Sequence, residues 1–190
     1  MSYEPRKAAQ LIAYRIMMAG GQSLNVLKAV MLVYLVDRES LRQFGFPVLD
    51  ERRVSMPHGP VNSSSYSHIN GEYDLEACGW SDFLEDNEHH QIALARPDLA
   101  LEDLDELSDA DIACADAVWE RFGHMNQWQL RDWTHDPRNV PEWEDPNGGS
   151  AEIPLRRILH AAGVRNAEDF LEAGKSFQTI DRAFEKARVQ

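Results

Sequence analysis

Cysteine is scarce in this sequence, since its 190 residues include only Cys78 and Cys114. Two thiols are too few for a disulfide framework or a cysteine-built zinc site, so we expect both to be reduced. Long apolar runs are also missing: the longest, residues 29–36, is far shorter than the roughly 20 residues that span a bilayer. The N-terminus has no apolar stretch behind a basic start, which argues against a signal peptide. We therefore expect a cytoplasmic protein without a membrane partner.

Positive charge is almost absent from the middle of the chain. Residues 72–120 contain sixteen Asp and Glu residues and one basic residue, Arg96, and the whole chain has a formal net charge of -13. Nucleic acid binding needs Lys and Arg side chains that neutralise phosphates, so this segment predicts that DNA and RNA are not partners. Such a segment is commonly a solvated acidic face. The alternative is a surface that meets a basic partner protein.

Motifs for catalysis and cofactor binding are missing as well. The sequence has no H-E-x-x-H metal motif, no G-x-S-x-G nucleophile motif and no glycine-rich phosphate loop. We therefore expect no catalytic residue, no metal, no cofactor and no enzymatic activity. One alternative stays open, because His58 and His135 each lie beside a proline-containing turn and would suit a histidine-dependent hydrolase.

What the sequence does contain is apolar periodicity of the helical kind. Residues 5–19 carry one apolar face, and residues 24–44, with Ser23 as the expected N-cap, are apolar on nearly all sides of a helix. A helix that is apolar all round is buried. We therefore predict a mainly α fold, classed as α+β or even all-α, in which a compact helical domain surrounds this central helix.

Strand-like patterns are short and few. Residues 52–56 alternate weakly, residues 91–95 alternate clearly, and residues 80–84 could pair with them. Economy of connection favours an antiparallel arrangement. The sequence thus predicts one small β element of two or three antiparallel strands.

The second half of the chain has regular helix-start signals. The spacing of a capping box occurs three times, in Ser108 with Asp111, Asn126 with Gln129, and Asn166 with Asp169. Residues 134–149 contain three prolines and two glycines and are expected to form a loop, after which Pro154 opens a further helix. We predict one domain over residues 1–165, and a helical extension over residues 166–190 that packs on this domain or frays from it.

A proline-rich corner separates the first half of the chain from the acidic segment. It consists of six consecutive residues, Met56, Pro57, His58, Gly59, Pro60 and Val61. Each proline fixes one φ angle and removes a backbone donor, and Gly59 permits a backbone shape that a Cβ would forbid. The corner should therefore be rigid and hold His58 in a defined direction. Rigid corners with a polar side chain are often binding sites, although many are only turns.

An ordered set of short motifs goes beyond these local patterns. The first half contains Leu24-Asn25-x-x-Lys28, Tyr34-Leu-Val-Asp-Arg38 with Leu41 and Gly45, and Met56-Pro-His-Gly-Pro-Val61. The second half contains Trp119-Glu-Arg-Phe-Gly123, Leu130-Arg-Asp-Trp-Thr-His135 and Pro141-Glu-Trp143. In this order and at these separations, the motifs resemble the Panacea domain, also called the SocA-like antitoxin domain, over roughly residues 5 to 163.

The resemblance implies a function in a toxin–antitoxin system. Domains of this kind act as antitoxins that neutralise a protein toxin by direct contact, and many of them are associated with phages or prophages. One member is a proteolytic adaptor that delivers its toxin to the ClpXP protease. The resemblance therefore implies a cognate protein toxin as the partner, with ClpXP as a second partner in the adaptor alternative.

The contact surface for such a toxin is expected around the proline-rich corner, the helix start after it and the polar end of the central helix. The candidate contact residues are Arg38, Arg42, His58, Asn62, Ser63, Tyr66 and Trp143, with Met56, Pro57, Gly59, Pro60 and Val61 as the structural motif. An alternative holds for the basic residues near this surface, Arg38, Arg42, Arg52 and Arg53. They could instead form internal ion pairs with the acidic middle of the chain.

Overall fold

The computed structural model describes residues 3–21, 23–87 and 89–172. Its centre is the helix α2 (Val26–Phe44), which packs against α1, α3, α4, α5, α6 and the strands β1 and β3. Met31 and Tyr34 on this helix are almost completely buried. The prediction of a buried central helix is therefore confirmed, because a helix with apolar residues on every side needs neighbours on every side.

The start of α2 differs from the sequence prediction. Asn25, not Ser23, is the N-cap, and its side chain accepts a hydrogen bond from the backbone N–H of Lys28. Ser23 belongs instead to the three-residue strand β1 (Ser23–Asn25). The far end of α2 is closed by Gly45, whose φ of 80° is the left-handed conformation that glycine adopts most easily.

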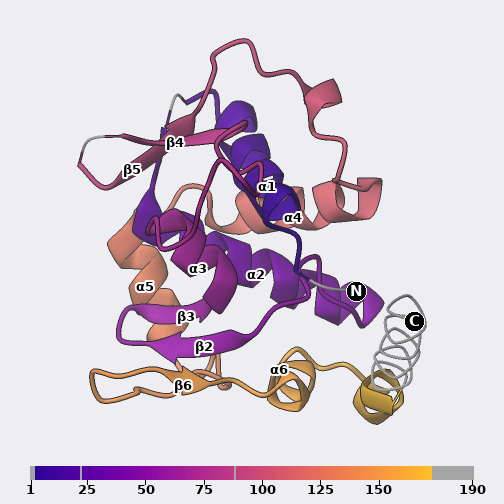
Figure 1. Ribbon diagram of the computed structural model, residues 1–190. Coiled ribbons are helices and arrows are strands. Elements are labelled where there is room, and N and C mark those ends of the chain that lie inside the picture. Colours follow the sequence, from indigo (N-terminus) through magenta and orange to yellow (C-terminus); the bar gives the residue numbers. More distant parts are fainter. Residues whose placement is uncertain (1–2, 22, 88, 173–190) are drawn as a thin grey trace, which may run out of the picture.

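Two sheets flank the central helix, and Figure 1 shows them on opposite sides of it. The first has the order β1-β5-β4, with β5 (Gln91–Leu94) between β1 and β4 (Leu84–Asn87). The second has the order β3-β2-β6, with β2 (Arg53–Met56) between β3 (Gly59–Asn62) and β6 (Ala151–Glu152). Every pairing is antiparallel.

These sheets correct part of the predicted fold description. The described residues form an α+β fold with two three-stranded antiparallel sheets. The sequence predicted a mainly α fold of the α+β class, so this class is right, whereas the all-α description and the single small β element are wrong. The expected pairing of residues 80–84 with residues 91–95 is shifted, since Leu84 pairs with Leu94 and the strand continues to Asn87. Among the strands of the described residues, β1 and β6 have only three and two residues, and β3 contains a proline. These three strands therefore show no alternation of apolar and polar residues in the sequence.

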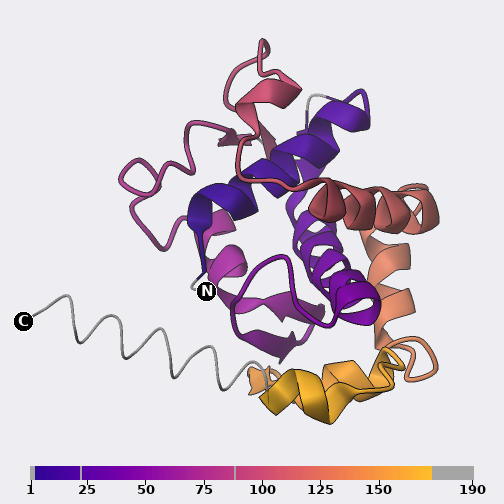
Figure 2. The ribbon, with the colours of Figure 1, turned by 90° about the vertical axis from the view of Figure 1, so that its right-hand side faces the viewer.

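The other helices surround α2 (Figures 1 and 2). They are α1 (Pro5–Met18), α3 (Ser63–Ile69), the 3-10 helix η1 (Leu101–Asp103), α4 (Asp109–Phe122), α5 (Gln127–His135) and α6 (Leu155–Ala161). The capping boxes predicted at Ser108 and Asn126 are both present, each with reciprocal side-chain and backbone hydrogen bonds. Local signals therefore placed the helix starts of the second half well.

The C-terminal part is described only in its first residues. Residues 167–172 are helical, and the rest of the predicted extension, residues 173–190, lies outside the described residues. Phe170 lies against Gly45, where an added Cβ would come within 2.1 Å of its ring. Among the described residues, no helix is both long and apolar enough to span a membrane.

Candidate functional site

The proline-rich corner is the tip of a β-hairpin. Strands β2 and β3 pair in register from Arg53 with Asn62 to Met56 with Gly59, so Pro57 and His58 form the two-residue connection. Both connecting residues are exposed, whereas Gly59 is buried with a φ of 129°. Residues with a side chain rarely adopt this backbone conformation, and a Cβ at position 59 would lie 3.0 Å from Oγ1 of Thr134. The hairpin therefore presents His58 from a closely packed base.

Trp143 holds this hairpin tip from the loop that follows α5. Its indole Nε1 donates a hydrogen bond to the backbone oxygen of Met56 at 3.1 Å. Its ring also stacks on the imidazole of His135, with ring centroids 4.1 Å apart and planes 8° from parallel. Three segments that are far apart in the sequence, the hairpin, the end of α5 and the loop around Trp143, therefore meet at one place.

The surroundings of His135 favour its neutral form. Partial burial lowers the pKa of its imidazole, and the charges of Arg131 and His58 lower this pKa further. Its Nε2 atom is buried and finds no hydrogen-bond partner in the described part of the chain. His135 thus contributes an aromatic face, stacked on Trp143, and His58 lies close enough for its charge to act on this ring.

A buried ion pair fixes the loop that carries Trp143. Glu142 is completely buried and accepts hydrogen bonds from Nε of Arg38 at 2.5 Å and from the hydroxyl of Tyr34 at 2.9 Å. Arg38 also donates to the backbone oxygen of Asn139 at 3.2 Å. Burial and the neighbouring Glu142 carboxylate both raise the pKa of Tyr34, so its hydroxyl stays protonated and donates. Two side chains of α2 therefore position the loop next to the hairpin.

A second buried network joins the hairpin itself to α2. Asp37 accepts hydrogen bonds from Arg53 at 2.7 Å, from the Asn62 amide at 2.9 Å and from the backbone N–H of Leu49 at 2.8 Å. Asn62 is 1% exposed. It was predicted as a contact residue, but its side chain faces the interior, so we leave it out of the proposed contact surface.

The remaining predicted contact residues lie apart from the hairpin tip. Ser63 and Tyr66 are half-buried on α3. Arg42 is on α2, where its guanidinium makes two hydrogen bonds to Glu39, at 2.9 and 2.6 Å. The structure therefore brings together His58 and Trp143, with Arg38 behind them, and sets Arg42 on another face.

The four arginines of the predicted alternative, Arg38, Arg42, Arg52 and Arg53, all pair with carboxylates of this chain. Their carboxylate partners are Glu142 for Arg38, Glu39 for Arg42, Glu152 for Arg52 and Asp37 for Arg53. The pairs are internal, as that alternative proposed, but none of these partners belongs to residues 72–120. The sequence did not indicate the partners, because they are brought together only by the fold. In the sequence, only the motifs Thr134-His135 and Pro141-Glu-Trp143 indicated that the loop containing Glu142 is important.

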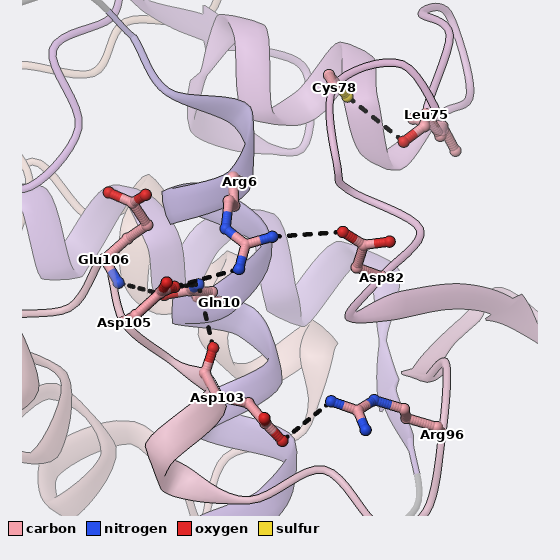
Figure 3. Close-up of polar contacts among 9 residues, drawn as sticks. All are labelled: Arg6, Gln10, Leu75, Cys78, Asp82, Arg96, Asp103, Asp105 and Glu106. Carbon is pink, nitrogen blue, oxygen red and sulfur yellow. Dashed lines mark hydrogen bonds and ion pairs between the residues drawn. The ribbon is translucent and has the colours of Figure 1, made fainter.

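The acidic segment forms ion pairs of its own around α1. Figure 3 shows Arg6 between Asp82 and Asp105, and Arg96 directed at Asp103. Gln10, which is completely buried, donates to Asp105 at 2.7 Å and accepts from the backbone N–H of Glu106 at 2.8 Å. A cavity of about 450 Å³ opens between Arg6, Phe83 and Arg96. Its charged side chains are already paired with one another.

Metal-ligating side chains do not gather in the described residues. No group of three or more His, Cys, Asp or Glu side chains there could hold a metal ion. Burial raises the pKa of the Cys114 thiol to about 11, so at neutral pH this cysteine is not a thiolate nucleophile.

A comparison with protein-family models assigns a family to the chain. Residues 31–144 match the family model described as antitoxin SocA-like, Panacea domain. The matched span contains the hairpin, α5 and Trp143, which are the three segments that meet at the candidate site. Searches of curated proteins and of solved structures found no match. Because the family model covers more than half of the chain, this protein belongs to the SocA-like antitoxin family with a Panacea domain.

Proposed function

We propose that this protein is an antitoxin that neutralises a protein toxin by binding it directly through the hairpin surface. We define the hairpin surface as Pro57, His58, His135 and Trp143. Family membership supports the antitoxin function in general. The observation that supports this location is the meeting of three distant segments at an exposed hairpin tip, fixed from below by the Trp143 hydrogen bond to Met56.

Rigidity is the physical argument for this surface. A contact site that is already ordered loses little conformational entropy on binding, so more of the contact energy appears as affinity. The hairpin tip has two prolines and a buried glycine with a φ of 129°, and its base is fixed by Trp143. Trp residues are also enriched among the side chains that dominate binding energy.

The hairpin tip alone is too small for a stable complex. Specific protein interfaces bury about 1,600 Å² in total, and two exposed residues supply only a fraction of this area. The half-buried Ser63 and Tyr66 on α3, the helix that follows the hairpin directly, could extend the contact. We therefore propose the hairpin tip as the centre of the interface and α3 as part of its rim.

The decisive experiment is co-expression of this protein with the product of the neighbouring gene as the toxin. We expect the wild-type protein to restore growth and to co-purify with the toxin. His58→Glu should weaken the complex about tenfold or more, since it places a charge at the centre of the interface. His124→Glu is the matched control, because His124 is also exposed but lies between α4 and α5. No rescue and no complex with the wild-type protein would contradict the proposal.

Two modes of neutralisation are compatible with direct binding. The protein can cover the active surface of the toxin, or it can act as an adaptor that delivers the toxin to ClpXP. The half-life of the toxin, measured with and without this protein and in cells that lack ClpXP, separates the two. An unchanged half-life together with growth rescue supports simple occlusion.

A histidine-dependent hydrolase is a second candidate, and the observation that favours it is that the charge of His58 contributes to the lowered pKa of His135. The lowered pKa of His135 would suit a general base. Purified protein can be tested with p-nitrophenyl acetate against the double variant His58→Gln, His135→Gln. Turnover that is lost in the double variant would favour the enzyme, and equal rates would remove it.

A further inference from the structure

A groove that none of the hairpin-surface residues lines has a distinct composition. It has a volume of about 190 Å³ and lies where α2, α4 and α5 meet, three helices that Figure 2 shows side by side. We call it the arginine groove. Its lining residues are Leu35, Arg38, Glu39, Arg42, Ala117, Val118, Arg121, Phe122 and Trp133.

The charge of the arginine groove opposes that of the chain. Three arginines and one glutamate line it, and Glu142 pairs with Arg38 from outside the lining, so one positive charge remains in excess, whereas the whole protein has a formal net charge of -13. A positive groove on an acidic protein attracts a negative group and directs it to one place. The remaining lining side chains are aliphatic or aromatic: Leu35, Val118 and Phe122 are buried, Ala117 is exposed and Trp133 is half-buried.

Two of the three arginines are already fixed from one side. Arg38 is held by Glu142, and Arg42 is held through Nε and Nη2 by both carboxylate oxygens of Glu39. These pairs lower the rotational freedom of both guanidinium groups before any ligand arrives. The Nη1 group of Arg42 takes no part in its hydrogen bonds to Glu39, which leaves N–H donors available for a ligand.

Arg121 has a weaker link to a carboxylate: its charge helps to lower the pKa of Glu39, after the hydrogen bonds from Arg42 and Gln43, but no hydrogen bond joins the two side chains. Its guanidinium lies over the rings of Phe122 and Trp133, with its central carbon 5.0 and 5.2 Å from their centroids. The two rings pack edge to face, 4.6 Å apart. Arg121 is exposed, and no residue in the described ranges gives it a hydrogen bond or a salt bridge. Its flat face is therefore supported while its N–H edge is open.

We propose that the arginine groove binds the carboxylate of an acidic side chain from a partner protein, with Arg121 as the main ligand and Arg42 as the second. A guanidinium supported on an aromatic face donates two parallel hydrogen bonds to a carboxylate. The half-buried Trp133 in the groove wall would lie against the methylene groups of a Glu or Asp side chain. The claim that the groove contacts the toxin rests on the proposed function. The claim that the groove binds a carboxylate is independent of that function.

Charge and size favour an acidic peptide segment over other anions. Nucleic acid would bring many phosphates close to a chain that carries thirteen excess negative charges, and such contacts are repulsive. Glu39 in the groove wall also disfavours a phosphate dianion more than a single carboxylate. One buried carboxylate per partner, with its neighbours outside the groove, fits the volume of about 190 Å³.

Peptide titration followed by NMR tests the inference without any toxin. The probe is the peptide acetyl-Glu-Glu-Glu-amide, and the neutral control is acetyl-Gln-Gln-Gln-amide. We expect saturable shifts of the Trp133 indole and Arg121 side-chain signals with the acidic probe alone, weakened by added salt. Arg121→Gln should reduce the affinity about tenfold or more. Arg165→Gln, another exposed arginine, should leave the affinity unchanged.

Four outcomes would overturn the inference. The first two are equal binding of the two peptides and an unchanged affinity in Arg121→Gln. The third is a loss of affinity in Arg165→Gln as large as in Arg121→Gln. The fourth is self-association of the protein that Arg121→Gln abolishes, which would assign the groove to a second copy of the chain. A thermal melt confirms that Arg121→Gln folds. Arg121→Lys keeps the charge but not the planar donor pair, so its affinity for the acidic peptide should lie between those of the wild type and Arg121→Gln. Growth rescue is scored separately, so a protein that fails to rescue but binds the acidic peptide refutes the proposed function alone.

Discussion

Two regions of this protein are rich in ionic groups, and they differ in their access to water. Beneath the hairpin, Asp37 and Arg53 are only 1% and 6% exposed. Around α1, the side chains of Asp82 and Asp105, which both pair with Arg6, are 65% and 63% exposed. Figure 3 shows this second region, where the ion pairs bridge segments at the surface. The same types of residue therefore stabilise the buried structure in one region and form exposed, solvated ion pairs in the other.

The difference follows from the cost of removing a charge from water. Exposed ion pairs contribute about 0–1 kcal/mol, because water screens them and the side chains lose freedom. Breaking a buried pair costs about 3–5 kcal/mol, because the remaining charge has neither a partner nor water. The buried pairs at Asp37 and Glu142 hold the hairpin and the Trp143 loop in place, so the binding surface that we propose depends on them.

The largest expected effect is that of Asp37→Ala. This change leaves Arg53 buried without its carboxylate and removes the acceptor for Asn62 and for the Leu49 backbone. We expect the free energy of unfolding to fall by about 3–5 kcal/mol, measured by denaturant titration. Asp82→Ala is the matched control for an exposed aspartate and should cost less than about 1 kcal/mol. Equal losses in the two variants would contradict the distinction between the regions.

The next effect is a pH dependence that arises from Glu51 in the buried region. Burial raises the pKa of Glu51 from 4.5 to about 7, although the hydrogen bonds from the Ser65 backbone and hydroxyl act in the opposite direction. A folded-state pKa above the unfolded value contributes stability that is fully present below pH 4.5 and is lost as the pH rises through 7. A tenfold difference between the acid dissociation constants of the folded and unfolded states corresponds to about 1.4 kcal/mol.

Glu51→Gln isolates this contribution. Between pH 5 and pH 8 the free energy of unfolding should fall by about 2.5 kcal/mol more for the wild-type protein than for the variant, since glutamine is neutral throughout. The measurement is the free energy of unfolding of both proteins at several pH values across this range. Parallel pH profiles for the two proteins would show that Glu51 is not protonated in the folded state near neutral pH.

A smaller effect is expected for Tyr34→Phe. This change removes one of the hydrogen bonds to the buried Glu142 but leaves the Arg38 pair in place. A hydrogen bond to a charged group contributes about 1.5–3 kcal/mol, so we expect the unfolding free energy to fall by about 2 kcal/mol. Tyr14→Phe serves as the control, because the Tyr14 hydroxyl bonds to Asp116, whose side chain is 55% exposed. A larger loss of unfolding free energy in Tyr14→Phe than in Tyr34→Phe would contradict the distinction between the buried and the exposed region.

The sequence predicted the helices better than the sheets, and the reason is the range of the interactions. The helix starts at Ser108 and Asn126 depend on side chains three residues away, so the pattern was visible. The strand β1 exists because Ser23–Asn25 pairs with Gln91–Ala93, far along the chain. No pattern within three residues can indicate such a partner.

The hairpin at the candidate site shows the same limit. The rigid tip and its unusual glycine could be predicted from Met56–Val61, but the strand β3 could not, because proline and glycine are poor strand residues. Pro60 is accommodated because β3 is the edge strand of the order β3-β2-β6, where one side of the strand needs no partner. Likewise, His58 and Trp143 were predicted as site residues, whereas the ion pair of Asp37 with Arg53 depends on tertiary contact.

The smallest effect is expected for Arg96→Ala on the acidic face. Arg96 pairs with Asp103 at 3.0 Å and with Asp98 at 3.7 Å, and its side chain is 46% exposed. We expect a loss below about 1 kcal/mol at low salt, which should shrink further at high salt as the charges are screened. Thermal melts of wild type and variant at two salt concentrations measure both effects. A loss that is larger than that of Tyr34→Phe, or one that salt does not reduce, would mean that this ion pair fixes η1 in the way that Asp37 fixes the hairpin, and that exposure alone does not separate the two regions.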